Sequence, residues 1–269
     1  MVQMMHEGVE IMNKKVILIS IDGMRADAFL QCGNPFAQEL MKLGAYTVNG
    51  QSVIPSVTLP AHMSMFHSVP PERHGITTNV YMPMVRPVKG LCSKLKEAGK
   101  VCAMYYGWEP LRDIARPATM KYATYINAYT DEGTDGILTD LALERIRRNK
   151  PDFVFLYMVE TDEKGGHDNG WMTQEYLRYV STALDNAKRV VEEMGQEYTI
   201  IITADHGGHD RAHGTTMPED MTVPMVFIGP DFAPGQELEN VCIMDIAPTV
   251  AHVMGVAPDP DWEGKVVAK

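Results

Sequence analysis

Hydrophobic residues in this 269-residue chain fall into two patterns, short continuous runs and longer stretches with a helical period. The first run lies within residues 15–22, where four consecutive aliphatic residues, 16–19, lead to Asp22-Gly23. Four similar runs follow at residues 101–106, 153–159, 198–203 and 223–228. Continuous apolar runs are typical of strands that are covered on both faces, as in a parallel sheet.

Helical periodicity separates these predicted strands. Apolar residues recur at spacings of three and four over residues 173–194, and Gly195 then favours the end of a helix. A second helix is predicted over residues 135–149, and shorter ones over 36–43, 91–98 and 245–254. The alternation predicts an α/β fold with a mostly parallel sheet between helices, in a single domain over residues 1–269. Residues 108–134 are the least regular and suggest a small insert, a lid or a surface loop.

Composition and charge narrow the possible partners. The net charge is −11, and no lysine or arginine cluster is long enough to follow a phosphate backbone, which argues against a long nucleic acid as partner. A small phosphorylated substrate remains compatible, because a bound metal reverses the local field. The first fifteen residues lack the order of a signal peptide, and the apolar runs are too short to span a bilayer. We therefore expect no membrane partner and a cytoplasmic location; the sequence does not indicate an oligomeric state.

Acidic residues and histidines gather where three of the predicted strands end. Because parallel strands end at the same edge of a sheet, where ligands bind, these side chains are expected to converge. They are Asp22, Asp162, His167, Asp205, His206 and His213. His209 competes with His213 for one place, and His6, His74 and His252 are assigned to structure or surface. Any one of these aspartates alone would be interpreted as a helix cap or turn former.

Several carboxylates at one sheet edge would repel one another and lose hydration, and a divalent cation removes both penalties. Mixed nitrogen and oxygen ligands favour Zn²⁺, with Mn²⁺ as an alternative. Six ligands exceed one tetrahedral site with an open position. They suit two divalent metal ions about 4 Å apart, which together stabilise the entering and leaving oxygens of a displacement.

A hydroxyl nucleophile is available in the polar turn at residues 55–62, which precedes the apolar stretch 63–66. Ser56 and Thr58 are both candidates, because a hydroxyl at a helix N-terminus faces a favourable field for a phosphoryl group. Each could instead serve only as a helix N-cap. The residues alone leave this choice open.

Five motifs occur in an order that resembles the type I phosphodiesterase/nucleotide pyrophosphatase family of the alkaline phosphatase superfamily. They are VILISIDGMR at 16–25, PSVTLPAH at 55–62, HGITTN at 74–79, DEKGGH at 162–167 and TADHGG at 203–208. The resemblance covers residues 16 to 214 and implies an alkaline phosphatase-like fold. The spacing from Asp162 to His167 is one residue longer than the family's usual Asp-x-x-x-His.

The resemblance also implies a role for each site residue. Thr58 would be the nucleophile, and Asn79 would donate a hydrogen bond to a phosphate oxygen. One metal would be held by Asp22, Thr58, Asp205 and His206. The other would be held by Asp162, His167 and His213, the last chosen for its His-Gly-Thr context.

The predicted function is metal-dependent hydrolysis of phosphodiester or nucleotide pyrophosphate bonds through a phosphothreonine intermediate. A phosphomonoesterase or a phosphonate hydrolase on the same two-metal core is the alternative. A non-catalytic metal-binding protein is the alternative from another class, although every expected ligand type is present. The Cys/Ser-x-Pro-x-Arg motif of sulfatases does not occur.

Overall fold

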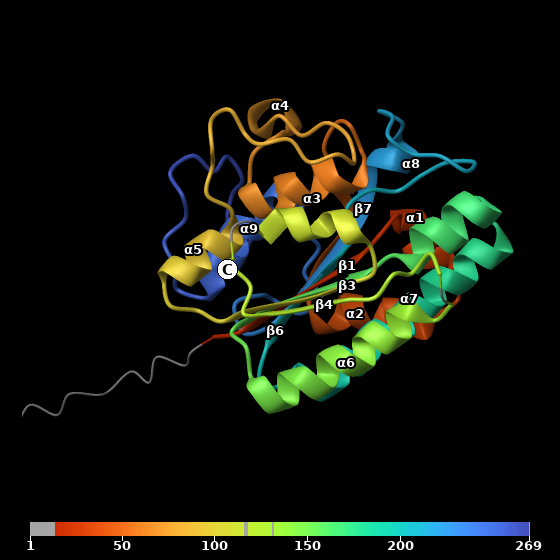
Figure 1. Ribbon diagram of the computed structural model, residues 1–269. Coiled ribbons are helices and arrows are strands. Elements are labelled where there is room, and N and C mark those ends of the chain that lie inside the picture. The colour runs from red at the N-terminus through yellow and green to blue at the C-terminus, as the bar shows by residue number, and fades with distance from the viewer. Residues whose placement is uncertain (1–13, 116–117, 131, 269) are drawn as a thin grey trace, which may run out of the picture.

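A computed structural model describes residues 14–115, 118–130 and 132–268. Within these residues the strands form one seven-stranded sheet in the order β2-β7-β6-β1-β5-β3-β4 (Figure 1). The strands are β1 (Val16–Ile21), β2 (Ala45–Gln51), β3 (Cys102–Tyr106), β4 (Tyr122–Tyr125), β5 (Phe153–Met158), β6 (Thr199–Thr203) and β7 (Thr222–Ile228). The continuous apolar sequences of β1, β5 and β6 agree with their complete burial at the centre of the sheet.

The three central strands end at the same edge. β1 pairs in parallel with β5 and with β6, so that Ile21 lies opposite Met158 and Ser20 lies opposite Thr203. The acidic residues that follow these strands therefore start from one level of the sheet. The sheet is mostly parallel, as expected. The exception is β7, which runs antiparallel to both of its neighbours, β6 and β2.

Helices cover both faces of the sheet (Figure 1). One face carries α1 (Ala26–Gln31), α2 (Pro35–Leu43), α6 (Thr134–Asn149) and α7 (Gln174–Met194). The other carries α3 (Thr58–His67), α4 (Pro71–His74), the 3₁₀ helix η1 (Glu109–Ala115), α5 (Leu91–Glu97), η3 (Ile243–Asp245) and α9 (Ile246–Val253). The π-helix η2 (Thr161–His167) and α8 (Pro218–Met221) lie in the loops that follow β5 and β6.

The predicted strands and long helices are confirmed, and the differences concern less regular sequence. β2 and β4 are two further strands, at opposite edges of the sheet. β4 belongs to the irregular stretch 108–134, which also contains η1. The polar turn at 55–62 is helical from Thr58 onward, where α3 begins. All ten residues of α3 are buried.

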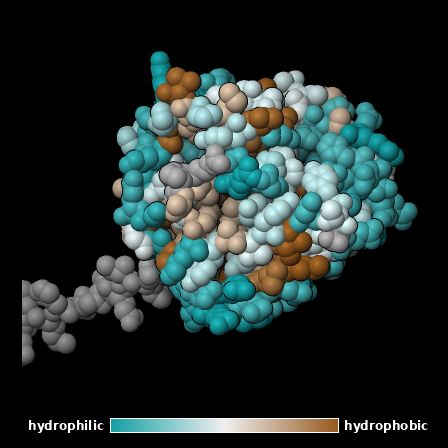
Figure 2. Space-filling model, viewed as in Figure 1, coloured by the Kyte–Doolittle hydropathy of each residue, from teal (hydrophilic) through white to brown (hydrophobic). Residues whose placement is uncertain are grey.

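α7 shows how local sequence produces the predicted amphipathic helix. The Thr173 side chain accepts a hydrogen bond from the Tyr176 backbone N–H and so caps the first turn. Most apolar positions from Tyr176 to Met194 are buried, and most of the polar positions between them are exposed or partly exposed; the buried Asn186 is an exception. On the face drawn in Figure 2, hydrophobic side chains lie in small separate patches within a mostly hydrophilic surface.

Some expectations concern other parts of the chain. The expectation about a signal peptide concerns residues 1–15, of which the structure describes only Lys14 and Lys15. His6 also lies outside the described residues. Among the described residues, no helix combines the length and apolar character needed to cross a membrane. The four cysteines are free; Cys92 and Cys102 are buried, and Cys32 and Cys242 are partly buried.

Candidate metal and nucleophile site

Two strand ends bring together a first group of ligands, the inner set, which consists of Asp22, Asp205 and His206. Asp22 follows β1, and the other two follow β6. The His206 Nε2 atom lies 3.3 Å from Asp22 Oδ1 and 3.4 Å from Asp205 Oδ2. One ligand atom from each residue lies within 4.8 Å of the others, a spacing that suits one metal ion.

A second group, the outer set, consists of Asp162, His167 and His213. Asp162 Oδ2 lies 3.4 Å from His167 Nε2, and Asp162 Oδ1 lies 3.9 Å from His213 Nε2. Asp162 and His213 also form a compact candidate group with His206, whose ring stacks on that of His213 with centroids 3.9 Å apart. The inner and outer sets are therefore adjacent.

The extra residue between Asp162 and His167 is accommodated by backbone geometry. Both residues lie in η2, a π-helix with a wider turn than an α-helix. A wider turn takes up one additional residue and still returns the imidazole to the carboxylate. The longer spacing therefore does not separate the two side chains.

All three histidines of the two sets are oriented by the same kind of hydrogen bond. The Nδ1 atoms of His206, His213 and His167 lie 2.8–3.0 Å from the carbonyl oxygens of Gly207, Ser56 and Arg211. A carbonyl only accepts, so each Nδ1 carries the proton and donates it. Each Nε2 then presents its lone pair toward the carboxylates, which is the orientation of a metal-ligating imidazole.

The donor atoms fit a bound cation. Asp22 Oδ1, Asp162 Oδ1 and Asp205 Oδ2 are buried oxygens without a hydrogen-bond partner in the described structure, and each faces a histidine Nε2 atom. Buried acceptors that face one another are satisfied only when a proton or a cation lies between them, and these oxygens converge with imidazole nitrogens as the ligands of a cation do. Burial raises the pKa of Asp205 to about 7 and lowers the pKa of His213 to about 3, so desolvation opposes charge on both kinds of ligand.

Carboxylate repulsion adds to the effect of burial. Burial first, and then the charge of Asp205, raise the pKa of Asp22 well above its usual value. The pKa of Asp162 is also raised, first by burial and then by Asp22. Burial lowers the pKa of His206. A divalent cation would offset the repulsion among these carboxylates.

The competing histidines and hydroxyls differ in their contacts. His209 directs Nδ1 to Asp220 Oδ1 at 2.7 Å, and the structure does not bring it to the two sets. His74 is buried against Ser64, and His252 is exposed. The Ser56 hydroxyl donates to the Thr215 carbonyl at 2.8 Å, so it supports the loop that carries His213.

Thr58 lies at the junction of the site and α3. Its Oγ1 atom lies 3.2 Å from His206 Nε2, and the residue opens α3 after the extended Val57. Asn79 lies beside it, because the Leu59 backbone N–H donates to Asn79 Oδ1 at 3.0 Å. The Asn79 amide nitrogen is not engaged by this bond and is available to donate to a ligand at the helix N-terminus.

These side chains line a hollow of about 60 Å³. Trp108, Tyr129 and Glu163 lie at the same hollow, so the irregular stretch 108–134 contributes two aromatic residues to the site. The other lining residues are Asp22, Thr58, Asn79, Tyr157, Val159, Asp162, His167 and His213. Neither lysine nor arginine is among these described lining residues.

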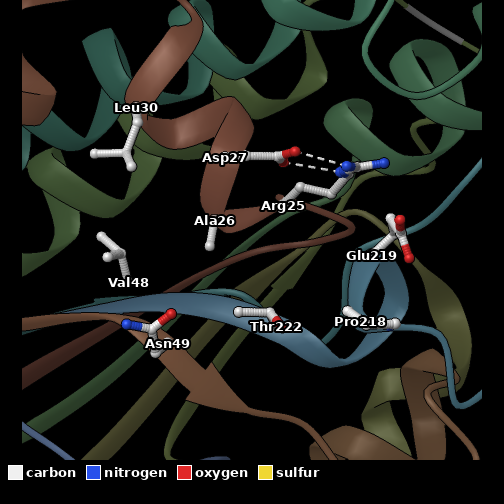
Figure 3. Close-up of a pocket in the computed structure, with 9 residues that line it drawn as sticks. All are labelled: Arg25, Ala26, Asp27, Leu30, Val48, Asn49, Pro218, Glu219 and Thr222. Carbon is white, nitrogen blue, oxygen red and sulfur yellow. Dashed lines mark hydrogen bonds and ion pairs between the residues drawn. The ribbon is translucent and has the colours of Figure 1, made fainter.

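Arg25, close in sequence to Asp22, and Arg73 in α4 make their hydrogen bonds outside the hollow. Arg25 makes two hydrogen bonds to Asp27, at 2.8 and 2.6 Å, and a third to the Gly208 carbonyl at 3.0 Å. It lines a separate hollow between α1, β2 and α8 (Figure 3). Arg73 donates to the Arg86 carbonyl at 2.7 Å. The anion-binding capacity of the site therefore rests on Asn79, helix α3 and any bound cation.

Three supporting residues were not identified from the sequence. Tyr157 donates a hydrogen bond to Asp22 Oδ2. His62 directs Nδ1 to the Thr58 carbonyl at 2.8 Å and lies 3.0 Å from the Ser20 hydroxyl through Nε2. Trp171 is buried and donates to the Gly23 carbonyl at 2.9 Å. Of these three residues, only His62 could have been found from the sequence, because it lies four residues after Thr58. The contacts of Tyr157 and Trp171 join residues far apart in the chain.

Close packing against Trp171 explains why two positions in the loops that carry the ligands are glycine. A Cβ atom on Gly166 or on Gly208 would lie 2.4 or 2.3 Å from the Trp171 ring. Both loops therefore pack directly on the indole, and its Nε1–H holds the loop that follows Asp22. One side chain thus fixes the spacing of the three loops that carry the ligands.

Comparisons with known proteins agree with the sequence motifs. A family model described as "Type I phosphodiesterase / nucleotide pyrophosphatase" matches residues 16–217. Ectonucleotide pyrophosphatase/phosphodiesterase family member 1 of Mus musculus is 28% identical over 221 residues, covering 71% of this chain and 24% of that protein. A 2,3-bisphosphoglycerate-independent phosphoglycerate mutase of Bacteroides thetaiotaomicron is 30% identical over 141 residues, or 48% of this chain and 26% of the mutase. The chain spans about a quarter of the length of these two relatives.

Solved structures confirm the fold. Inactive murine ectonucleotide pyrophosphatase/phosphodiesterase 5 in complex with AMP has a TM-score of 0.78 at 14% identity, covering 95% of this chain and 97% of that chain. The phosphonate monoester hydrolase of Silicibacter pomeroyi has a TM-score of 0.73 at 15% identity, covering 94% and 76%. The predicted alkaline phosphatase-like architecture is therefore correct.

Proposed function

Since the chain belongs to the type I phosphodiesterase/nucleotide pyrophosphatase family, we propose that it hydrolyses phosphodiester or nucleotide pyrophosphate bonds with Thr58 as nucleophile. The observation that supports this most strongly is the orientation of His167, His206 and His213. Each donates Nδ1–H to a carbonyl and directs Nε2 at carboxylate oxygens. The Nε2 atom of His206 also lies 3.2 Å from the Thr58 hydroxyl. A small phosphorylated substrate is the expected partner.

The inner set and Thr58 would hold one divalent ion, and the outer set would hold a second. When bound, the ions would supply Lewis-acid stabilisation of negative charge on the oxygens around phosphorus. Zn²⁺ suits the mixed imidazole and carboxylate donors, and Mn²⁺ is the alternative. Tyr157 and the three backbone carbonyls would keep these donors oriented.

Thr58 would act in two displacements. Its Oγ1 atom attacks phosphorus and forms an O–P bond as the bond to the leaving alcohol or phosphate breaks, and the hydroxyl proton goes to that leaving group. A water oxygen then attacks the same phosphorus, the Oγ1–P bond breaks, and a proton from that water restores the Thr58 hydroxyl. Asn79 would donate a hydrogen bond to a non-bridging oxygen during both steps, and the His62 bond to the Thr58 carbonyl would hold the nucleophile in place.

Two observations favour a threonine nucleophile and a diester substrate. The inactive murine relative in complex with AMP carries a threonine-to-alanine substitution. The hollow here has no lysine or arginine among its described lining residues, and Glu163 adds a carboxylate. A diester carries one negative charge at phosphorus and a monoester carries up to two, so this lining favours the diester.

The test compares hydrolysis of bis-p-nitrophenyl phosphate with that of p-nitrophenyl phosphate, with added Zn²⁺ or Mn²⁺ and with a chelator. We expect faster cleavage of the diester and its loss on chelation. Faster cleavage of the monoester would make the protein a phosphatase with the same site. No turnover of either compound by the metal-loaded protein would favour the non-catalytic alternative.

A phosphonate monoester is a second candidate substrate, because the Silicibacter pomeroyi hydrolase of phosphonate monoesters shares the fold. Such an ester also carries a single negative charge, so it meets the same requirement of the lining. p-Nitrophenyl phenylphosphonate, tested beside the diester, separates the two activities by their kcat/KM. The cytoplasmic location stays a prediction.

A further inference from the structure

Two buried carboxylates join the end of β5 to the start of α6. Asp135 is 3% exposed and Glu160 is 6% exposed. Asp135 accepts hydrogen bonds from the backbone N–H groups of Val159 and Glu160, each at 3.0 Å. Glu160 accepts in return from the N–H groups of Gly133, at 2.7 Å, and of Asp135, at 3.3 Å. Each carboxylate thus binds the backbone beside the other, and we refer to the pair as the carboxylate clamp.

The clamp begins where the backbone pairing of β5 with β1 ends. The pairing of β5 with β1 ends at Met158, opposite Ile21. The N–H groups of Val159 and Glu160 lie beyond this last pair, and Asp135 provides their acceptors. Buried backbone donors require such partners, so the side chain of Asp135 takes the place of a neighbouring strand.

The outer set starts directly from this clamped backbone. The N–H groups of Asp162 and Glu163 donate to the Val159 carbonyl at 3.2 and 3.1 Å and so form the first turn of η2. Asp135 therefore holds the residue on which the turn that carries Asp162 is built. Neither Asp135 nor Glu160 is among the residues that line the hollow, so neither is placed to contact substrate.

The inner set has a different support. The backbone N–H of Asp22 donates to the Met158 carbonyl at 2.9 Å, which continues the sheet ladder. Asp205 accepts a hydrogen bond from the Gly23 backbone N–H at 3.3 Å. A disturbance of the clamp should accordingly reach the outer set first.

We propose that Asp135 and Glu160 are positioning residues that set the metal affinity of the outer set through the backbone of residues 159–163. The proposal rests on the proposed function, because it assumes one ion in each set. Removing a partner that hydrogen-bonds a metal ligand directly lowers metal affinity about 10–100-fold. The clamp acts one step further away, through the backbone, so its effect is expected at the lower end of this range.

Calorimetric titration of the chelator-treated full chain with Zn²⁺ tests the proposal. Asp135→Asn is compared with Asp140→Asn, a matched control on the same helix whose exposed carboxylate pairs with Arg189. His167→Ala identifies which binding step belongs to the outer set. We expect Asp135→Asn to weaken that step about 10-fold, and to leave the inner step and the Asp140→Asn titration at wild-type values.

A purely structural role would lower the thermal unfolding temperature and leave the ratio of the two affinities unchanged. That result, or equal weakening of both steps, would overturn the proposal. If Asp135→Asn does not fold, Glu160→Gln is titrated in its place, and failure of both variants to fold would also overturn it. A wild-type protein that binds fewer than two ions would contradict the two-metal function before any variant is compared, and the clamp proposal with it.

Discussion

The inner and outer ligand sets are adjacent, yet the fold supports them differently. The side chains of the inner set are 0–2% exposed and follow the central strands directly. In the outer set, Asp162 is 8% exposed, His213 is 9% exposed and His167 is 36% exposed. The inner set is fixed by the sheet, whereas the outer set depends on a π-turn, a loop and backbone carbonyls beyond the sheet.

This difference separates two tasks within one site. A buried set beside the Thr58 hydroxyl suits charge stabilisation at the nucleophile, because desolvated charges interact strongly. A more exposed set suits the entry of water for the second displacement.

Thr58→Ala removes the atom that the inner set would activate. We expect kcat for the diester to fall at least about 10³-fold, as for other nucleophile deletions. Metal binding should be partly retained, because all the carboxylates and imidazoles remain. Activity at the wild-type level would rule out Thr58 as nucleophile.

Asp205→Asn and His167→Asn compare the sets directly. Asp205→Asn keeps the side-chain shape but removes a buried negative charge, so the inner ion should be lost and kcat/KM should fall about 10²–10³-fold. His167→Asn should weaken only the outer ion, with a loss of about 10–100-fold. Metal content by mass spectrometry and steady-state kinetics measure both variants. Equal losses would mean that the two sets do not act separately.

His213→Ala and His209→Ala separate the two histidines that the sequence left in competition. His213 faces Asp162 and stacks on His206, so its removal should lower outer-set occupancy and kcat/KM about 10-fold or more. His209 binds Asp220, so its removal should leave the metal content at two ions. The opposite outcome would assign the ligand role to His209.

Gly208→Ala tests the packing that joins the loops of both sets. The added Cβ would lie 2.3 Å from the Trp171 ring, so the ring or the loop must move. We expect a loss of about 1–3 kcal/mol in the free energy of unfolding, measured with urea, because overpacking in a dense region costs this much. Gly136→Ala is the control, since the nearest atom to its added Cβ is Asn186 Oδ1 at 3.9 Å, an ordinary contact distance, and it should not destabilise the protein.

The pH dependence of folding can be followed at His67, which belongs to neither set. Burial lowers its pKa to about 4, below the usual 6.5. Between these values the unfolded chain binds a proton that the folded protein does not, so stability falls as pH drops from 6.5 to 4 and then levels off. The maximum contribution is about 3 kcal/mol. Urea unfolding at pH 7 and pH 4.5 should show a smaller difference in His67→Gln; an unchanged difference would exclude His67 as the source.

The same contrast explains how much of the molecule could be predicted from sequence. The central strands have continuous apolar sequences, so both they and the residues that follow them were found. β2 and β4 are edge strands with alternating or partial burial, and they lack such runs. α3 is buried on every side and contains Pro60 and two histidines, so it has no amphipathic signal.

Within the site, the sequence indicated which residues would converge but not what holds them. The ligands follow apolar strands in identifiable motifs. The carboxylate clamp depends on a contact between residues 24–25 positions apart, and the Trp171 packing joins Gly166 to Gly208. Such tertiary contacts leave no local pattern. The π-turn was also missed, although the additional residue between Asp162 and His167 was its signal.

The most direct test of the central claim is to detect the covalent intermediate on Thr58. Full-length protein turning over bis-p-nitrophenyl phosphate is quenched in acid, digested and analysed by mass spectrometry. We expect a p-nitrophenyl phosphoryl group on the Thr58 peptide, and we expect it to be absent with chelator and in Thr58→Ala. Rapid metal-dependent turnover with no adduct, and with Thr58→Ala still active, would contradict the account and indicate direct attack by water.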